Sequence, residues 1–195
     1  MYGKNSSGVA SSPLIDSDRR LVTVASGGKH AEAAMAGRLF YAANINMVAT
    51  STTLNTGFVG LGLCNPTGSG KNVIVHEFGW AIIVAVVAGA VLALATTTDS
   101  GFADDVNAPI KCCRDGYATS VCYTDEGATI VAPTIVKIVT QIADANINTY
   151  QPRLQVLDLG GSIVLAPGRA LVTDTTTVFA ASSAQFSFMW EEVDA

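Results

Sequence analysis

The segment formed by residues 161–193 constrains the fold more than any other part of the chain. Two stretches rich in branched apolar residues, 162–165 and 169–173, flank the dipeptide Pro167-Gly168. Proline fixes φ and glycine accepts a positive φ, so this dipeptide reverses the chain at low cost. A Thr-rich connection and a long final strand, ending at two glutamates, follow. The pattern predicts a terminal hairpin in antiparallel β-structure, with no reactive side chain, which favours an interface protein over an enzyme.

Short apolar segments bounded by Gly, Pro and Asn continue upstream, and each predicts a strand. These segments are residues 39–47, 57–64, 72–87, 90–96, 117–123, 134–141 and 153–159. The alternation within 134–141 predicts a strand with one wet face, and the polar stretch 97–116 predicts an exposed loop at one end of a sandwich. With about eight to ten short strands and few helix signals, the sequence predicts an all-β fold, an antiparallel β-sandwich or jelly roll spanning residues 37–195.

Residues 1–36 predict an extended N-terminal arm, because residues 1–30 are rich in Ser, Gly and charge and carry little apolar surface. At its end, HAEAAMAG predicts a short helical turn stopped by Gly37. The apolar residues of the arm can anchor it on a neighbour as it orders, and we take four as candidate interface residues: Leu14, Ile15, Leu21 and Val22. The first residues lack the apolar core of a secretory signal, so we expect synthesis in the cytoplasm.

Charged residues make up only 14% of the chain, against roughly 25% in average globular proteins. Mean hydropathy is +0.39. A chain so poor in charge either sits in a membrane or buries much of its surface against other chains. The net charge is −5 and no basic run is present, so the phosphate-neutralising footprint of a nucleic-acid-binding protein is missing.

The stretch 78–98 has no charged residue and is long enough to span a bilayer as a helix. Gly79 and Gly89 interrupt it, valine and isoleucine dominate its first half, and no basic cluster flanks it. We therefore predict two buried strands and no membrane contact. A small membrane protein spanning at 78–98 remains the alternative.

Motifs for catalysis, cofactors or metals are weak. The run from Gly68 to Lys71 resembles the end of a phosphate-binding loop, but Asn72 stands where Ser or Thr is required, and a β-turn is expected instead. His30 and His76 are far apart in the sequence. Glu191 and Glu192 point to opposite faces of a strand, which predicts a solvated terminus and no acid–base pair. We expect no catalytic residue, cofactor or metal.

The four cysteines, Cys64, Cys112, Cys113 and Cys122, lack the CxxC spacing of a zinc or redox site. Free thiols in a reducing cytosol are one interpretation. The other is a disulfide joining Cys122 to one of its two adjacent partners across a hairpin that bears Asp115-Gly116.

Three segments together resemble small structural proteins of tailed-bacteriophage virions. They are GRLFYAANINMVATSTTLNTGFVGLGLCNPTGSGKNVIV, DLGGSIVLAPGRALV and FSFMWEEV, and the resemblance covers residues 37–193. It implies a non-enzymatic jelly-roll subunit, homotrimeric, that resides in the virion and binds the major capsid protein or another virion protein. Cementing or decorating the capsid is the first expectation, and a neck, tail or fibre position is the alternative. The cysteine-bearing stretch 111–122 has no counterpart in this pattern.

A third class is a sugar-binding jelly-roll enzyme or lectin. Such a site needs aromatic side chains and carboxylates around a concave surface. Trp80 and Trp190, together with the five tyrosines, are the aromatic residues available to line it, and the sequence offers no convincing pair of acids.

Overall fold

The computed structural model describes residues 3–4, 10–11, 28–48, 50, 57–82, 91–141, 155–175 and 184–195. The chain divides into two units, Met1–Glu32 and Ala33–Ala195. In the first unit, β1 (Gly3–Lys4) and β2 (Ala10–Ser11) pair antiparallel.

The described residues contain a single short helix, α1 (Ala31–Met35), which lies between β2 and the first strand of the sandwich in the sequence. Gly37 follows it with φ +70°, which ends the helix as predicted. A side chain at this position would also collide with the ring of Tyr117, because an added Cβ would lie 2.1 Å from its Cδ1.

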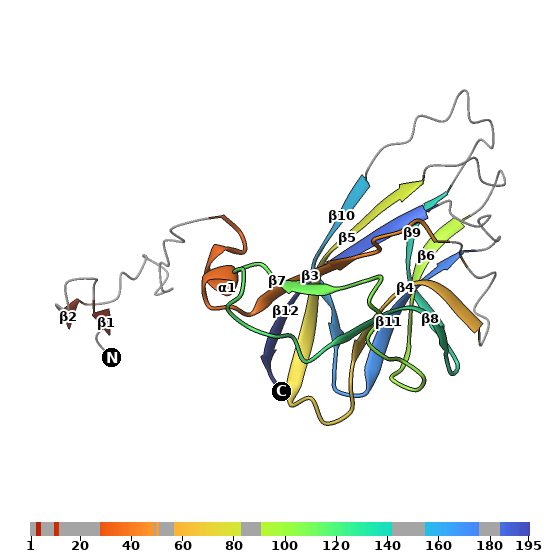
Figure 1. Ribbon diagram of the computed structural model, residues 1–195. Helices are drawn as coiled ribbons and strands as arrows, with labels where there is room; N and C mark the ends of the chain where they lie inside the picture. Colours follow the sequence, from red (N-terminus) through yellow and green to blue (C-terminus); the bar gives the residue numbers. More distant parts are fainter. Residues whose placement is uncertain are drawn as a thin grey trace, which may run out of the picture. The chain divides into compact units, whose positions relative to one another are not determined.

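Two five-stranded antiparallel sheets form the body of the second unit (Figure 1). Sheet I contains, in spatial order, β10 (Gln155–Leu165), β5 (Lys71–Ile82), β12 (Ala184–Asp194), β3 (Leu39–Ala43) and β7 (Ile110–Cys112). Sheet II contains, in spatial order, β8 (Tyr123–Thr129), β4 (Gly57–Asn65), β11 (Arg169–Thr175), β6 (Val91–Thr98) and β9 (Thr134–Gln141). The sheets pack against each other, so the predicted all-β sandwich is confirmed.

The order of the strands is that of a jelly roll. Four antiparallel pairs, β3·β12, β4·β11, β5·β10 and β6·β9, join the first half of the chain to the second in reverse order. Successive pairs alternate between sheet I and sheet II, as in a long hairpin that has been rolled up. The two remaining strands, β7 and β8, follow β6 in the chain and extend the two sheets at their edges.

The core lies between the sheets and is dominated by aromatic residues of sheet I. Phe78 has ring centroids of three other aromatic residues within 5.1–6.0 Å: Trp80, Phe186 and Phe188. Sheet II contributes fully buried leucines: Leu61, Leu63, Leu92, Leu94 and Leu171. The inward positions alternate along the strands, and this period-two burial explains why these sequences form β-structure.

The described part of the uncharged stretch 78–98 is β-structure, since β5 ends at Ile82 and β6 begins at Val91. Phe78, Trp80, Ile82 and two leucines of β6 are buried in the core. Residues 83–90 lie outside the described residues. Among the described residues, no helix is both long and apolar enough to cross a membrane.

The Pro167-Gly168 turn forms as predicted, with φ +83° at Gly168, but the predicted hairpin is wrong. The strand before the turn, β10, pairs with β5 in sheet I, whereas β11 pairs with β4 and β6 in sheet II. The turn therefore carries the chain from one sheet to the other. The two strands predicted before it are one strand, β10, bent at Gly160 and Gly161, both with positive φ.

The predictions for residues 97–141 need three corrections. Residues 117–122 are not a strand; the strand in this region is β8, which begins at Tyr123. The expected loop contains a short edge strand, β7. Six of the eight side chains of β9 are exposed, including those of consecutive residues from Thr134 to Ile138, so the expected single wet face is wrong. Edge strands are hard to recognise in a sequence. An edge strand has a neighbouring strand on one side only, and neither of its faces needs to be fully buried.

Candidate functional site

A cleft of about 450 Å³ lies between the segments that carry β7 and β8, at one side of the sandwich. Its lining includes three carboxylates, Asp104, Asp105 and Asp115, against one lysine, Lys111. Val106, which is 84% exposed, contributes apolar surface. Partial burial raises the pKa of the Asp104 carboxyl above its usual value. The cleft is therefore suited to a ligand that presents both a cation and apolar groups.

Hydrogen bonds of the backbone and of the Thr124 side chain hold the two walls of this cleft together. The amide of Asp105 donates to the carbonyl of Thr124 at 2.9 Å, and the Thr124 hydroxyl donates to the carbonyl of Ala108. Asp105 also accepts a bond from the amide of Asn107 at 2.8 Å. The two bonds of Thr124 join the loop before β7 to β8, a contact that no local sequence signal could have indicated.

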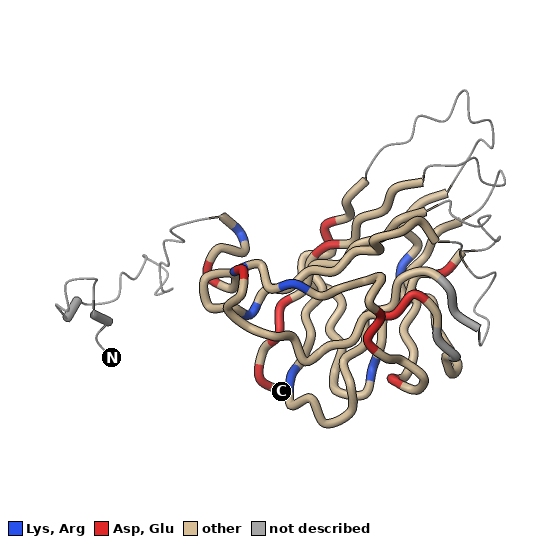
Figure 2. Tube along the Cα trace, viewed as in Figure 1, with Lys and Arg blue, Asp and Glu red and all other residues tan. Residues whose placement is uncertain are grey.

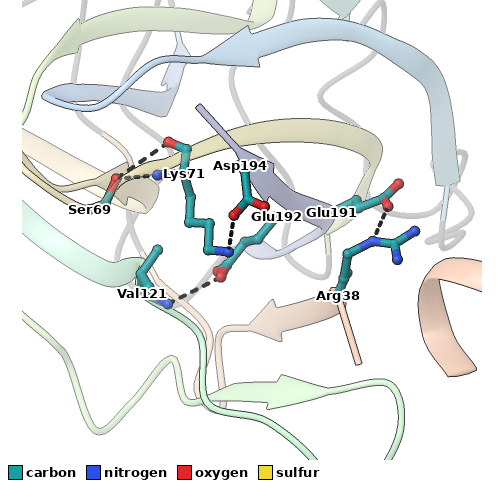
Figure 3. Close-up of polar contacts among 7 residues, drawn as sticks. All are labelled: Arg38, Ser69, Lys71, Val121, Glu191, Glu192 and Asp194. Carbon is teal, nitrogen blue, oxygen red and sulfur yellow. Dashed lines mark hydrogen bonds and ion pairs between the residues drawn. The ribbon is translucent and has the colours of Figure 1, made fainter. Parts of the chain in front are cut away.

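The two glutamates near the C-terminus point to opposite faces, as predicted, but they are not a solvated terminus. Glu191 accepts a bond from Arg38 at 2.9 Å (Figure 3). Its Oε2 also lies 3.5 Å from Nε2 of His76. Glu192 is only 5% exposed and accepts bonds from the Ser120 hydroxyl, the Val121 amide and the Trp190 indole. Glu192 thus ties the segment before β8 to the centre of sheet I, which is a structural role.

All four cysteines are free, so the alternative disulfide of Cys122 is not formed. Cys64, Cys112 and Cys122 are buried, and Cys113 is exposed. Burial, reinforced by Asp99 and Asp125, raises the pKa of Cys64 to about 12. Burial and the nearby Glu192 also raise the pKa of the Cys122 thiol. A thiol with a raised pKa is a poor nucleophile, because the thiolate is the reactive form.

We expect an alkylating reagent to label the native protein at Cys113 alone, because this cysteine is exposed. Labelling at neutral pH should be slow, because partial burial and the neighbouring Cys112 raise the pKa of the Cys113 thiol. The buried thiols should react only after unfolding in urea, when all four become accessible. Mass spectrometry of the labelled chain measures this directly, with Cys113→Ser as the control that abolishes native labelling. Rapid native labelling of Cys122 would contradict the buried arrangement.

The remaining sequence candidates are structural. Residues 66–70 form the turn between β4 and β5, where Ser69 bonds the amide of Lys71, and the lysine side chain pairs with Asp194 at 2.7 Å. The predicted β-turn is confirmed.

His76 is the extra residue of a β-bulge in β5, between the positions paired with Met189 and Trp190.

The four candidate interface residues of the arm, Leu14, Ile15, Leu21 and Val22, lie outside the described residues. The two tryptophans considered for a sugar site are 5% and 0% exposed and belong to the core, so neither can line one. In the described part of the chain, no group of His, Cys, Asp and Glu side chains is arranged to hold a metal ion.

The opposite side of the sandwich, formed by β9 and β10, carries exposed apolar residues. Five branched residues there are between 39% and 56% exposed: Ile135, Val136, Ile138, Val156 and Val164. Figure 2 shows how sparse charges are along the described chain. This side had no distinct sequence signal, because its residues follow the same pattern as those of buried strands.

Comparisons of the chain with protein-family models, curated proteins and solved structures gave no match. The fold and the two sides of the sandwich are therefore the basis for assigning a function.

Proposed function

We propose that this protein is a non-enzymatic structural subunit of a tailed-bacteriophage virion, made in the host cytoplasm and assembled as a homo-oligomer. Its first expected place is on the capsid, as a cement or decoration protein that stabilises the shell. A neck, tail or fibre position is the alternative within the same class. The resemblance of residues 37–193 to virion proteins favours a trimer and the major capsid protein as a partner.

The observation that carries this proposal is the exposed apolar side of the jelly roll. Branched side chains of β9 and β10 stand in solvent on two neighbouring sheet edges. Exposed branched side chains on edge strands are suited to contacts with other chains. Burial of these side chains against other subunits would explain why they are exposed in the single chain. It would also explain why only 14% of the residues are charged.

The polar groups of the second unit support a structural role. Near the end of β12, Glu192 accepts a hydrogen bond from the amide of Val121 and Glu191 forms an ion pair with Arg38. The cysteines with raised pKa values are held as thiols. Jelly rolls are widely used as building blocks of viral shells, as well as of lectins, so the fold is compatible with the proposal.

The arm should attach the subunit to its partner. We expect deletion of residues 1–25 to leave a folded oligomer that no longer binds particles lacking this protein, because the arm contains the apolar anchors Leu14, Ile15, Leu21 and Val22. Co-sedimentation of wild-type and truncated protein with such particles measures the binding.

A quadruple replacement of the four anchors by serine is the matched control, since it keeps the length of the arm. Loss of binding in both variants would support the anchors. Equal binding by wild-type and truncated protein would place the attachment surface on the β-domain, and no binding by wild-type protein would contradict the virion assignment.

A further inference from the structure

The face of sheet II that is turned away from sheet I is buried. Leu63 and Leu171 point into the core between the sheets, so the residues that follow them, Cys64 and Val172, point outward. Cys64, Val172 and Ala95 are nevertheless at most 1% exposed. This outer face is therefore covered by other parts of the chain.

Residues 99–103, which we call the strap, follow β6 and cross this outer face. The register of sheet II places four residues in one row across four strands: Asp125, Gly62, Val172 and Ala95. Phe102 packs against the β11 and β6 members of this row. The amide of Ala103 donates to the Asp125 carboxylate of β8 at 3.1 Å. The strap thus runs along the row, from β6 to the opposite edge of the sheet.

Hydrogen bonds hold the strap mainly at its two ends. At its start, the Asp99 carboxylate accepts a bond from the Thr67 amide at 2.7 Å, and the Asp99 amide donates to the Gly168 carbonyl at 3.1 Å. At its end is the bond between Ala103 and Asp125. Residues 100 and 101 are exposed, and none of residues 99–103 belongs to a strand. Segments with few buried contacts and exposed hydrogen bonds open at a lower free energy than the core strands.

The apolar cluster under the strap is separate from the main core. It consists of Ala95, Ile130 and Val172, with Phe102 packed against it. The main core lies on the other face of sheet II, between the two sheets. Removing the strap therefore leaves the packing that joins the sheets unchanged.

The thiol of Cys64 can report whether the strap is closed. Burial raises its pKa to about 12, and the carboxylates of Asp99 and Asp125, which anchor the strap, raise it further. When the strap is released, solvent reaches the thiol and Asp99 moves away from it. Both changes favour the thiolate, which is the reactive form.

We infer that residues 99–103 are a detachable strap, whose release uncovers the apolar outer face of sheet II while the two sheets stay folded. In the closed form the strap conceals this apolar surface and the Cys64 thiol. A local change at the strap is then enough to expose both, without unfolding of the domain. This is a conformational device beyond the proposed structural role.

Alkylation of the native protein, read by mass spectrometry, tests the strap. All variants carry Cys113→Ser, which removes the exposed thiol. We expect Phe102→Ala to raise the labelling rate of Cys64 at least about tenfold, because the ring is the main apolar contact of the strap. Cys122, which belongs to the main core, should stay protected. Val106→Ala is the matched control, because Val106 is 84% exposed and lies outside the strap.

Asp99→Ala is a second strap variant with little risk to folding, because Asp99 is near the surface and is not part of a strand. It removes the anchor at the start of the strap and should raise Cys64 labelling at least about threefold. Phe102→Ala changes no charge, so its effect cannot come from altered electrostatics at the thiol. Circular dichroism confirms that each variant is folded, and Asp99→Ala decides the outcome if Phe102→Ala is not.

Three results would overturn the inference. One is Cys64 labelling in both strap variants at the wild-type rate. Another is labelling of Cys64 and Cys122 at equal rates in the strap variants, since only unfolding of the whole domain exposes both. The third is an increase in Val106→Ala as large as that in Phe102→Ala. Particle binding and oligomeric state are measured separately and do not enter this test.

Discussion

Replacing Phe78 with alanine is expected to lower the free energy of unfolding by about 3–5 kcal/mol, the usual cost of removing a buried aromatic ring. Phe78 is fully buried and lies among Trp80, Phe186 and Phe188, so the cavity would open at the centre of sheet I. Domains are stable by only about 5–15 kcal/mol, so this single substitution should remove a large part of the total stability. Urea denaturation followed by circular dichroism measures the change.

Val164→Ala is the matched control for this experiment. Val164 lies on β10 of the same sheet but is 55% exposed, so its truncation should change stability by less than about 0.5 kcal/mol. All proteins are compared at one concentration, because assembly adds to apparent stability. Equal losses for the two variants would contradict the assignment of the core to the space between the sheets.

Replacing Glu192 with leucine is expected to cost about 3 kcal/mol, although the substitution adds apolar surface to a buried position. The Ser120 hydroxyl, the Val121 amide and the Trp190 indole would lose their common acceptor. Buried donors left without a partner lose their solvation, and each costs about 1–3 kcal/mol when no water replaces the bond. Urea denaturation measures the effect.

Two further variants are the controls for Glu192→Leu. Glu192→Gln keeps an acceptor oxygen and should recover part of the lost stability. Asp194→Ala removes the partner of Lys71 at an exposed position two residues along the strand, and it should cause no measurable loss because exposed ion pairs contribute little. If Asp194→Ala destabilised the protein as much as Glu192→Leu, the network around Glu192 would not have the role described here.

The sequence predicted most strand positions because apolar residues recur where inward-facing side chains are needed. Residues 134–141 match β9, and residues 57–64 lie within β4. The sequence could not predict which of the two sheets each strand joins. The Pro167-Gly168 turn has a hairpin sequence, yet in a jelly roll the chain crosses between the sheets at this point, and that choice depends on pairing with β5 and β4, distant in the chain.

The candidate site was the least predictable part. Strand β8 contains Asp125, Glu126 and Gly127, which break an apolar pattern, and Asp125 is used to bond the amides of Ala103 and Gly127. The cleft beside it is lined mainly by residues between 104 and 124, and the position of this segment depends on the pairing of β7 with the distant strand β3. The sequence places Glu192 in solvent, and this prediction is wrong. Its burial depends on contacts with Ser120 and Val121, which are more than seventy residues away in the chain.

Quantitative mass spectrometry of purified particles tests the central claim most directly. Particles are purified from cells that make this protein, and its abundance is compared with that of the main shell protein. We expect a constant, multiple-copy ratio in intact particles across successive purification steps, as for an integral structural subunit. Abundant protein in the cell lysate combined with its absence from purified particles would contradict the account.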